Sequence, residues 1–179
     1  MIKLYRKTER PAEYWEYWTT STHLVIHWGI VGKKGDTREL DIKKDKQAIP
    51  LAEDEQKKMK AAGFSPIPSE QMAQVVIQYR ITGMGSTKDL DKEQAIENLL
   101  NESLGWTGLG NCDGHDIGSG TLNIFCDVVD GAIAEKVVID CLKENGQLDG
   151  AVIARRERLG DESYKVFWPD SFKGEFELM

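Results

Sequence analysis

A glycine-rich segment, residues 105–120, holds the densest group of side chains that could do chemistry. Cys112 and His115 stand three residues apart, with Asp113 and Asp116 beside them. A thiolate, an imidazole and carboxylates are the ligands of divalent metals. An imidazole also lowers the pKa of a neighbouring thiol, which favours nucleophilic chemistry. The segment is therefore a candidate for a metal site, a thiol enzyme or a ligand-binding loop.

The same segment has a plainer interpretation, which the sequence favours. In a long β-bulged turn, the polar side chains satisfy backbone groups and His115 makes one hydrogen bond. A structural zinc site needs four ligands, and no second close cysteine pair is present. We therefore predict no resident metal or cofactor, with Cys112 and His115 as the weak metal candidates. The candidate binding residues of this segment are Trp106, Asn111, Asp113, His115 and Asp116.

Alternating and helical patterns surround this segment. Strands are predicted at residues 74–82, 121–129, 151–156 and 164–168, and helices at residues 91–104 and 133–142. Residues 105–109 or 116–117 supply one further strand. The order β-α-β-β-α-β resembles the ferredoxin-like fold, in which two helices cover one face of an antiparallel sheet. That topology alone implies no function.

The first third of the chain has a different pattern. Four short strands, at residues 1–5, 14–19, 23–28 and 38–42, precede one helix that begins near Pro50 and stops at Gly63. Two prolines after Gly63 mark a linker. The predicted fold class is α+β: a domain at residues 1–66, a linker at 67–73 and a ferredoxin-like domain at 74–179.

Residues 27–37 read His-Trp-Gly-Ile-Val-Gly-Lys-Lys-Gly-Asp-Thr, and the lysine-rich helix that follows ends in Gly63-Phe64. This layout resembles the WGR domain, named for Trp-Gly-Arg, over about the first 65 residues. WGR domains occur in many bacterial proteins and beside poly(ADP-ribose) polymerase catalytic domains, where they contact DNA ends. Ile30 stands at the arginine position, and isoleucine cannot pair with phosphate. The resemblance thus implies the fold more than DNA binding, and no polymerase chemistry.

Trp28, Lys33 and Lys34 are the candidate binding residues of this first domain. For Trp28 we favour a place in the small core, with stacking on a partner as the alternative. Lys33 and Lys34 form a basic rim that could meet phosphate, although acidic residues such as Asp36 are interleaved with it and favour an ordinary solvated surface.

Composition excludes several classes of protein. The net charge is −7, and residues 71–179 carry 10 basic against 19 acidic residues, which disfavours a general grip on nucleic acid. Apolar runs are too short for a membrane helix, and the N-terminus lacks a signal-peptide pattern. We expect a cytoplasmic protein that contacts no membrane and whose three cysteines are reduced thiols.

These observations predict a non-enzymatic binding or adaptor protein that engages a protein partner, of which a toxin-neutralising immunity protein is one form. Nucleic-acid binding through the first domain is the alternative. A small metal- or thiol-dependent enzyme that uses residues 105–120 is the second alternative. Edge strands of the predicted sheets can pair across a two-fold axis, so a homodimer stays open.

Overall fold

The computed structural model of the chain describes residues 1–7, 11–161 and 163–178, and it forms two compact units. The first unit comprises residues 1–67 together with 106–108, and the second comprises the rest. The chain first passes between the units after Ile67. Residues 67–73, expected to be linker, include the short 3-10 helix η1 (Ser69–Gln71) and the first residue of the next strand.

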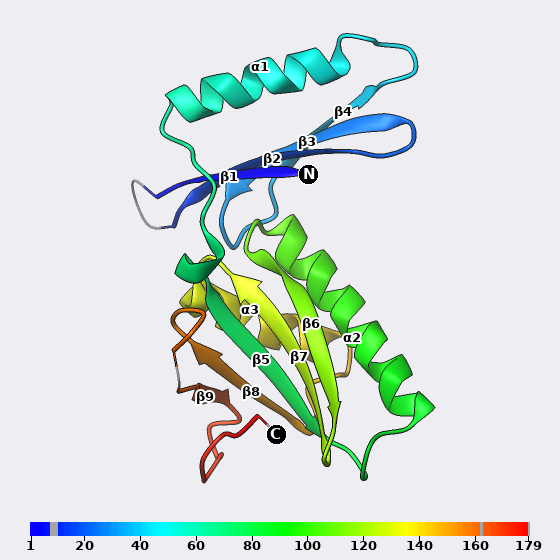
Figure 1. Cartoon of the computed structure of the whole chain (residues 1–179), viewed down its shortest axis with the longest axis vertical. Helices are drawn as coiled ribbons and strands as arrows, with labels where there is room; N and C mark the ends of the chain where they lie inside the picture. Colours follow the sequence, from blue (N-terminus) through cyan, green and yellow to red (C-terminus); the bar gives the residue numbers. More distant parts are fainter. Residues whose placement is uncertain (8–10, 162, 179) are drawn as a thin grey trace. The chain divides into compact units, whose positions relative to one another are not determined.

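Four antiparallel strands in the order β1-β2-β3-β4 build the sheet of the first unit, and one helix packs on it (Figure 1). The strands are β1 (Ile2–Arg6), β2 (Glu13–Thr19), β3 (His23–Ile30) and β4 (Asp36–Asp41), and the helix is α1 (Ala48–Ala61). Pro50 lies in the first turn of α1, where its missing N–H costs no hydrogen bond. Lys58 and Lys60 lie in the last turn, at the negative end of the helix dipole.

The core of the first unit lies between α1 and one face of the sheet. Side chains of alternate strand residues share a face, and the face toward α1 carries Leu4, Trp15, Leu24 and Ile26. Ala48 and Ala52 of α1 pack against them. The small alanine side chains let the helix approach the sheet closely.

Tyr14 dominates the opposite face of this sheet and is almost fully buried. It leaves no room for side chains on two nearby glycines. A Cβ on Gly35 would overlap the phenol oxygen of Tyr14 and the carbonyl oxygen of Trp28, and a Cβ on Gly29 would lie 2.9 Å from the Cα of Gly35. Close packing, and not an unusual backbone angle, therefore requires glycine at position 35.

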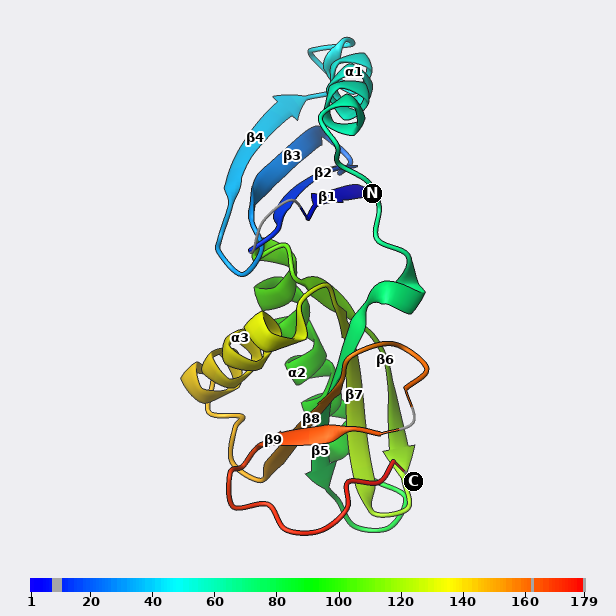
Figure 2. The same cartoon turned by 90° about the vertical axis from the view of Figure 1, so that its left-hand side faces the viewer.

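The second unit contains five strands and two helices. They are β5 (Ala73–Arg80), α2 (Thr87–Trp106), β6 (Gly110–Gly118), β7 (Thr121–Val128), α3 (Gly131–Glu144), β8 (Ala151–Arg156) and β9 (Lys165–Trp168). The strand order is β6-β7-β5-β8-β9, and every neighbouring pair is antiparallel. Both helices cover the same face of the sheet (Figure 2).

The predicted fold class is confirmed: the chain is α+β, and β5-α2-β6-β7-α3-β8 has the ferredoxin-like order, with β9 added beside β8. The strand that the sequence left ambiguous is β6, which spans Gly110–Gly118. Residues 105–109 form no strand, so that alternative is wrong. None of the helices in the described ranges is long and apolar enough to cross a membrane.

The helix α2 carries a built N-terminal cap. Asp89 accepts hydrogen bonds from the backbone amide of Ser86, at 2.8 Å, and from its hydroxyl, at 2.6 Å. The Ser86 carbonyl in turn accepts from the amides of Asp89 and Leu90. This reciprocal arrangement satisfies amides that have no partner inside the helix, and so it fixes where α2 begins.

Replacement of Gly35 by alanine should destabilise the first unit by about 1–3 kcal/mol, the usual cost of overpacking a well-filled site. Urea titration followed by circular dichroism measures it. Gly105→Ala is the matched control, because no heavy atom lies within 4 Å of the place that its new Cβ would take. We expect that control to be neutral or slightly stabilising, and equal stabilities of the two variants would contradict the role assigned to Tyr14.

Asp89→Asn tests the cap through pH. Hydrogen bonds from the Ser86 hydroxyl and amide hold the pKa of Asp89 below its usual range. The folded state therefore binds this proton less readily than the unfolded state, so the carboxylate stabilises the fold above a pH of about 4 and loses this effect as the pH falls. Wild type should melt higher than Asp89→Asn at pH 7, and the gap should close in acid. Asp91→Asn, which removes an exposed carboxylate from the same helix, should show a smaller gap.

Candidate functional site

The glycine-rich segment is mainly strand β6 and not a binding loop. Its first residues close α2, and the remainder pairs with β7 along Gly110–Gly118. The expectation of a loop over residues 105–120 is therefore wrong. Pairing with β7 overrides the weak strand preference of glycine, because a neighbouring strand satisfies the backbone groups of β6 whatever its side chains are.

A bulge in β6 decides which of its side chains meet the helices. Cys112 lies opposite Cys126 and His115 lies opposite Ile124, so Asp113 and Gly114 together occupy the space opposite one residue. In a regular strand, residues three apart point to opposite faces. The extra residue instead brings Cys112 and His115 to the same face, the one that α2 and α3 cover.

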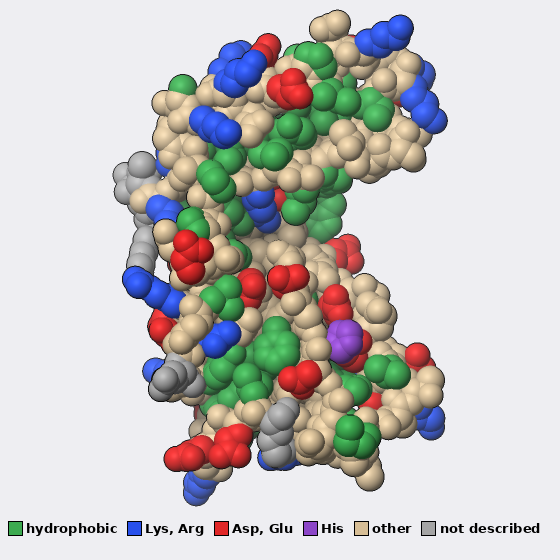
Figure 3. All heavy atoms as spheres, viewed as in Figure 1, with side chains coloured by type: hydrophobic (Ala, Val, Ile, Leu, Met, Phe, Trp, Pro, Cys, Tyr) green, Lys and Arg blue, Asp and Glu red, His purple; other side chains and the backbone are tan. Residues whose placement is uncertain are grey.

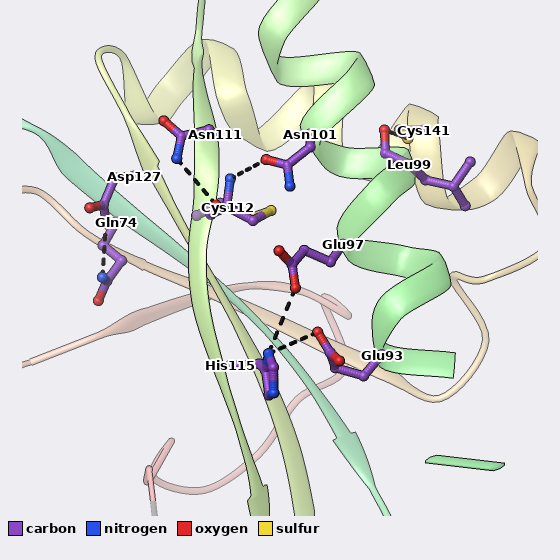
Figure 4. The surroundings of a disulfide bond; sticks show 11 residues. Gln74, Glu93, Glu97, Leu99, Asn101, Asn111, Cys112, His115, Asp127 and Cys141 are labelled. Atoms are coloured by element: carbon purple, nitrogen blue, oxygen red, sulfur yellow. Dashed lines mark hydrogen bonds and ion pairs between the residues drawn. A yellow bond between two sulfur atoms is a disulfide. The ribbon is translucent and has the colours of Figure 1, made fainter. Parts of the chain in front are cut away.

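Cys112 and Cys126 form a disulfide bond between β6 and β7 (Figure 4). The expectation of three reduced thiols is wrong for these two, and Cys141 is the free cysteine. Because the sulfur of Cys112 is bonded to Cys126, Cys112 offers neither a metal ligand nor a nucleophile in this state. The weak candidate pair of Cys112 with His115 is thereby removed.

The other candidates on β6 do not gather around His115. Asp116 lies on the opposite face of the sheet, where its carboxylate accepts a hydrogen bond of 2.6 Å from the buried Asn123. Asn111 is exposed and donates to the carbonyl of Cys112, and Asp113 is exposed on the bulge. The predicted constellation of Cys112, Asp113, His115 and Asp116 does not exist as one site.

Two glutamates of α2 converge on His115 instead (Figure 4). Nδ1 of His115 lies 3.0 Å from Oε1 of Glu93 and 3.7 Å from Oε2 of Glu97. One helical turn separates the glutamates, so both reach the same side of α2. Neither glutamate was predicted as a site residue, although the sequence holds a signal: Glu93 occupies the same helix face as the buried Ile96, Leu100 and Leu104.

Glu93 is an unusual carboxylate for its surroundings. Its side chain is only 4% exposed, and its Oε1 accepts no hydrogen bond from the described residues. Burial raises the pKa of Glu93, the neighbouring Glu97 raises it further, and His115 opposes the change. A buried carboxylate in this state needs a proton, a cation or a metal ion.

A second feature is a groove in the first unit, with a volume of about 520 Å³. Sheet residues Trp15, Trp28 and Ile30 form one wall, and Met59 and Phe64 contribute the other side. Trp28 is 37% exposed and Ile30 is 40% exposed. The expectation that Trp28 fills the core is therefore wrong, because Trp15 takes that place and Trp28 lines the groove.

The charged side chains that line this groove are mostly paired. Arg38 bonds Glu55 at 2.6 Å, and Glu13 accepts a hydrogen bond of 2.8 Å from Arg6. Lys58 also lines it. The lining charges, two acidic and two basic, cancel. Lys33 and Lys34 are exposed in the turn between β3 and β4 and do not line the groove.

Behind the groove, a chain of buried polar groups crosses the other face of the sheet. Tyr14 Oη lies 2.8 Å from Nε2 of His27, whose Nδ1 lies 2.8 Å from Glu16. Lys3 completes the chain, 3.2 Å from Glu16. Burial raises the pKa of Tyr14, which keeps its phenol protonated. Trp106 belongs to the first unit as well, and the centre of its ring lies 5.1 Å from the centre of the His27 ring. Each buried polar group of this network therefore has a partner within the first unit.

Comparisons with known proteins add no relative. No protein-family model matches the sequence, and no curated protein or solved structure is significantly similar to it.

Thiol counting tests the disulfide. Denatured but unreduced protein should react with one equivalent of a maleimide, at Cys141, and reduced protein with three. Mass spectrometry of the alkylated chain measures both. In a Cys126→Ser variant, unreduced protein should show two reactive thiols. Three equivalents in the unreduced wild type, purified without reductant, would show that the bond is absent in solution.

Proposed function

We propose that the chain is a binding protein, and that its first unit is a WGR-like module whose groove receives an apolar segment of a protein partner. The observation that carries this proposal is the exposure of Trp28 at the groove, beside the equally exposed Ile30. A large aromatic side chain in a concave apolar site is a typical anchor for a protein partner.

The charges of the groove favour a protein segment over a nucleic acid. Nucleic-acid grooves present several cations to the phosphates, whereas here Arg38 is already paired with Glu55 and the lining charges cancel. Ile30 replaces the motif arginine with a side chain that gains only from apolar contact. Lys33 and Lys34 alone make a weak site for phosphate.

The charge of the second unit favours a basic partner. Residues 71–179 carry 19 acidic against 10 basic residues. Figure 3 shows acidic side chains scattered over this part of the visible face. Fields of opposite sign speed association and exclude partners of like charge.

Two features support the resemblance to the WGR domain. Trp28 and Gly29 lie near the end of β3, in a four-stranded sheet that packs against a lysine-rich helix. Gly29 and Gly35 pack too tightly for side chains. These are two of the three glycines in the stretch that carries the resemblance, so the packing gives a physical reason for that part of the motif.

A displayed library of random peptides, selected against the full chain, tests the proposal. We expect selected peptides to share an apolar anchor residue and to bind the Trp28→Ala variant at least about tenfold more weakly, the loss typical of a central interface aromatic. Ile30→Arg should also weaken binding, since it replaces an apolar side chain at the groove wall with a charged one. Isothermal titration measures each affinity.

Leu51→Ala is the matched control, because Leu51 is comparably exposed and lies on α1 but does not line the groove. It should bind the peptides as the wild type does. Selection of no peptide, or equal losses for Leu51→Ala and Trp28→Ala, would overturn the proposal. Tight binding of duplex DNA with a steep salt dependence would also overturn it, in favour of the nucleic-acid alternative.

A further inference from the structure

The cluster of Glu93, Glu97 and His115 in the second unit is independent of the groove and has the donor set of a metal site. One donor atom from each residue lies within 4.8 Å of the other two. The donors come from two elements, since α2 supplies both carboxylates and β6 supplies the imidazole. In Figure 4 both carboxylates point toward the ring of His115.

The burial of one oxygen of Glu93 distinguishes this site from an ordinary surface cluster of charged side chains. Glu93 Oε1 is buried and accepts no hydrogen bond from the described residues, although it faces His115 at 3.0 Å. Apart from this contact with His115, the oxygen has no partner among the described residues, and a buried carboxylate oxygen without a hydrogen bond is costly. A cation bound between the three donors would satisfy this oxygen and also reduce the repulsion between the two glutamates.

The spacing suits a small ion. Tetrahedral zinc holds nitrogen and oxygen donors at about 2.0–2.2 Å, which places the donors roughly 3.4 Å from one another. The two distances from Nδ1 of His115, 3.0 and 3.7 Å, lie on either side of that value. The third separation, between the two carboxylates, lies within 4.8 Å, so side-chain rotation can bring the three donors to this spacing.

The donor types select among metals. Magnesium and calcium prefer six or more oxygen ligands, whereas imidazole suits zinc and its neighbours in the first transition row. Three protein donors leave a tetrahedral zinc ion one open position for water. His115 is 42% exposed, which provides a path for an ion from solvent.

We propose that Glu93, Glu97 and His115 bind one zinc ion, which links α2 to the edge strand β6 and keeps one coordination position open to water. The bulge at Asp113 and Gly114 is then part of the site, because it turns His115 toward α2. The site is built on the disulfide-bonded pair of strands and does not involve the cysteine sulfurs.

Titration of the metal-free full chain with zinc chloride tests the proposal. We expect one ion per chain by calorimetry, and the same stoichiometry by elemental analysis after dialysis. Glu97→Gln and His115→Ala should each weaken zinc binding by about tenfold or more, since the loss of even a supporting group costs about that much. Cobalt bound at the same site should give visible absorption bands that vanish in His115→Ala.

Two variants serve as matched controls. Glu102→Gln removes an exposed glutamate from the same helix, and His23→Ala removes a histidine of the first unit. Both should bind zinc as the wild type does. Glu97 and His115 are partly exposed, so their variants should remain folded, which circular dichroism checks.

Absence of stoichiometric zinc, or equal binding by Glu97→Gln and Glu102→Gln, would overturn the proposal. Magnesium binding in place of zinc would overturn the choice of metal.

Discussion

A carboxylate buried on the apolar face of a helix needs a compensating group, and this constraint explains much of the second unit. Glu93 occupies the stripe of α2 that otherwise carries Ile96, Leu100 and Leu104. The cap at Ser86 and Asp89 fixes the start of the helix, and the bulge in β6 turns an imidazole toward it. Of these two features, the bulge bears on the buried carboxylate, because it places the imidazole of His115 3.0 Å from Oε1 of Glu93.

The first unit is organised around a different constraint, the volume of its aromatic side chains. Trp15 fills the core beneath α1, and Tyr14 fills the space behind the sheet so completely that Gly29 and Gly35 carry no side chain. Trp28 lies directly opposite Trp15 on the neighbouring strand and lines the groove. The core therefore holds one of the two indoles, and the other lies at its margin, where it lines the groove.

Patterns of apolar residues were enough to predict the fold class, because alternation and helical periodicity describe which faces are buried. They placed β6 only as one of two short alternatives, residues 116–117, and could not predict its full extent, because its glycines have weak strand preference and its pairing depends on β7. They also could not predict the partners of His115. A single extra residue in a strand reverses the side-chain direction, and sequence spacing alone does not reveal it. Glu93 could have been found, as a charge at an apolar position of α2. The exposure of Trp28 could not have been predicted from the sequence, because it depends on how far α1 extends over the sheet.

The bond between Cys112 and Cys126 has a consequence for how this protein meets other copies of itself. β6 is the outermost strand on its side of the sheet, and such strands are the usual ones to be exchanged between chains. A covalent tie between β6 and β7 closes a loop over a sequence separation of 14 residues, so β6 cannot leave β7 to complete the sheet of a neighbour. Oxidised chains are thereby protected from strand swapping on this side, while reduced chains lose that protection. Reduction of this bond would therefore remove a restraint on the edge of the sheet.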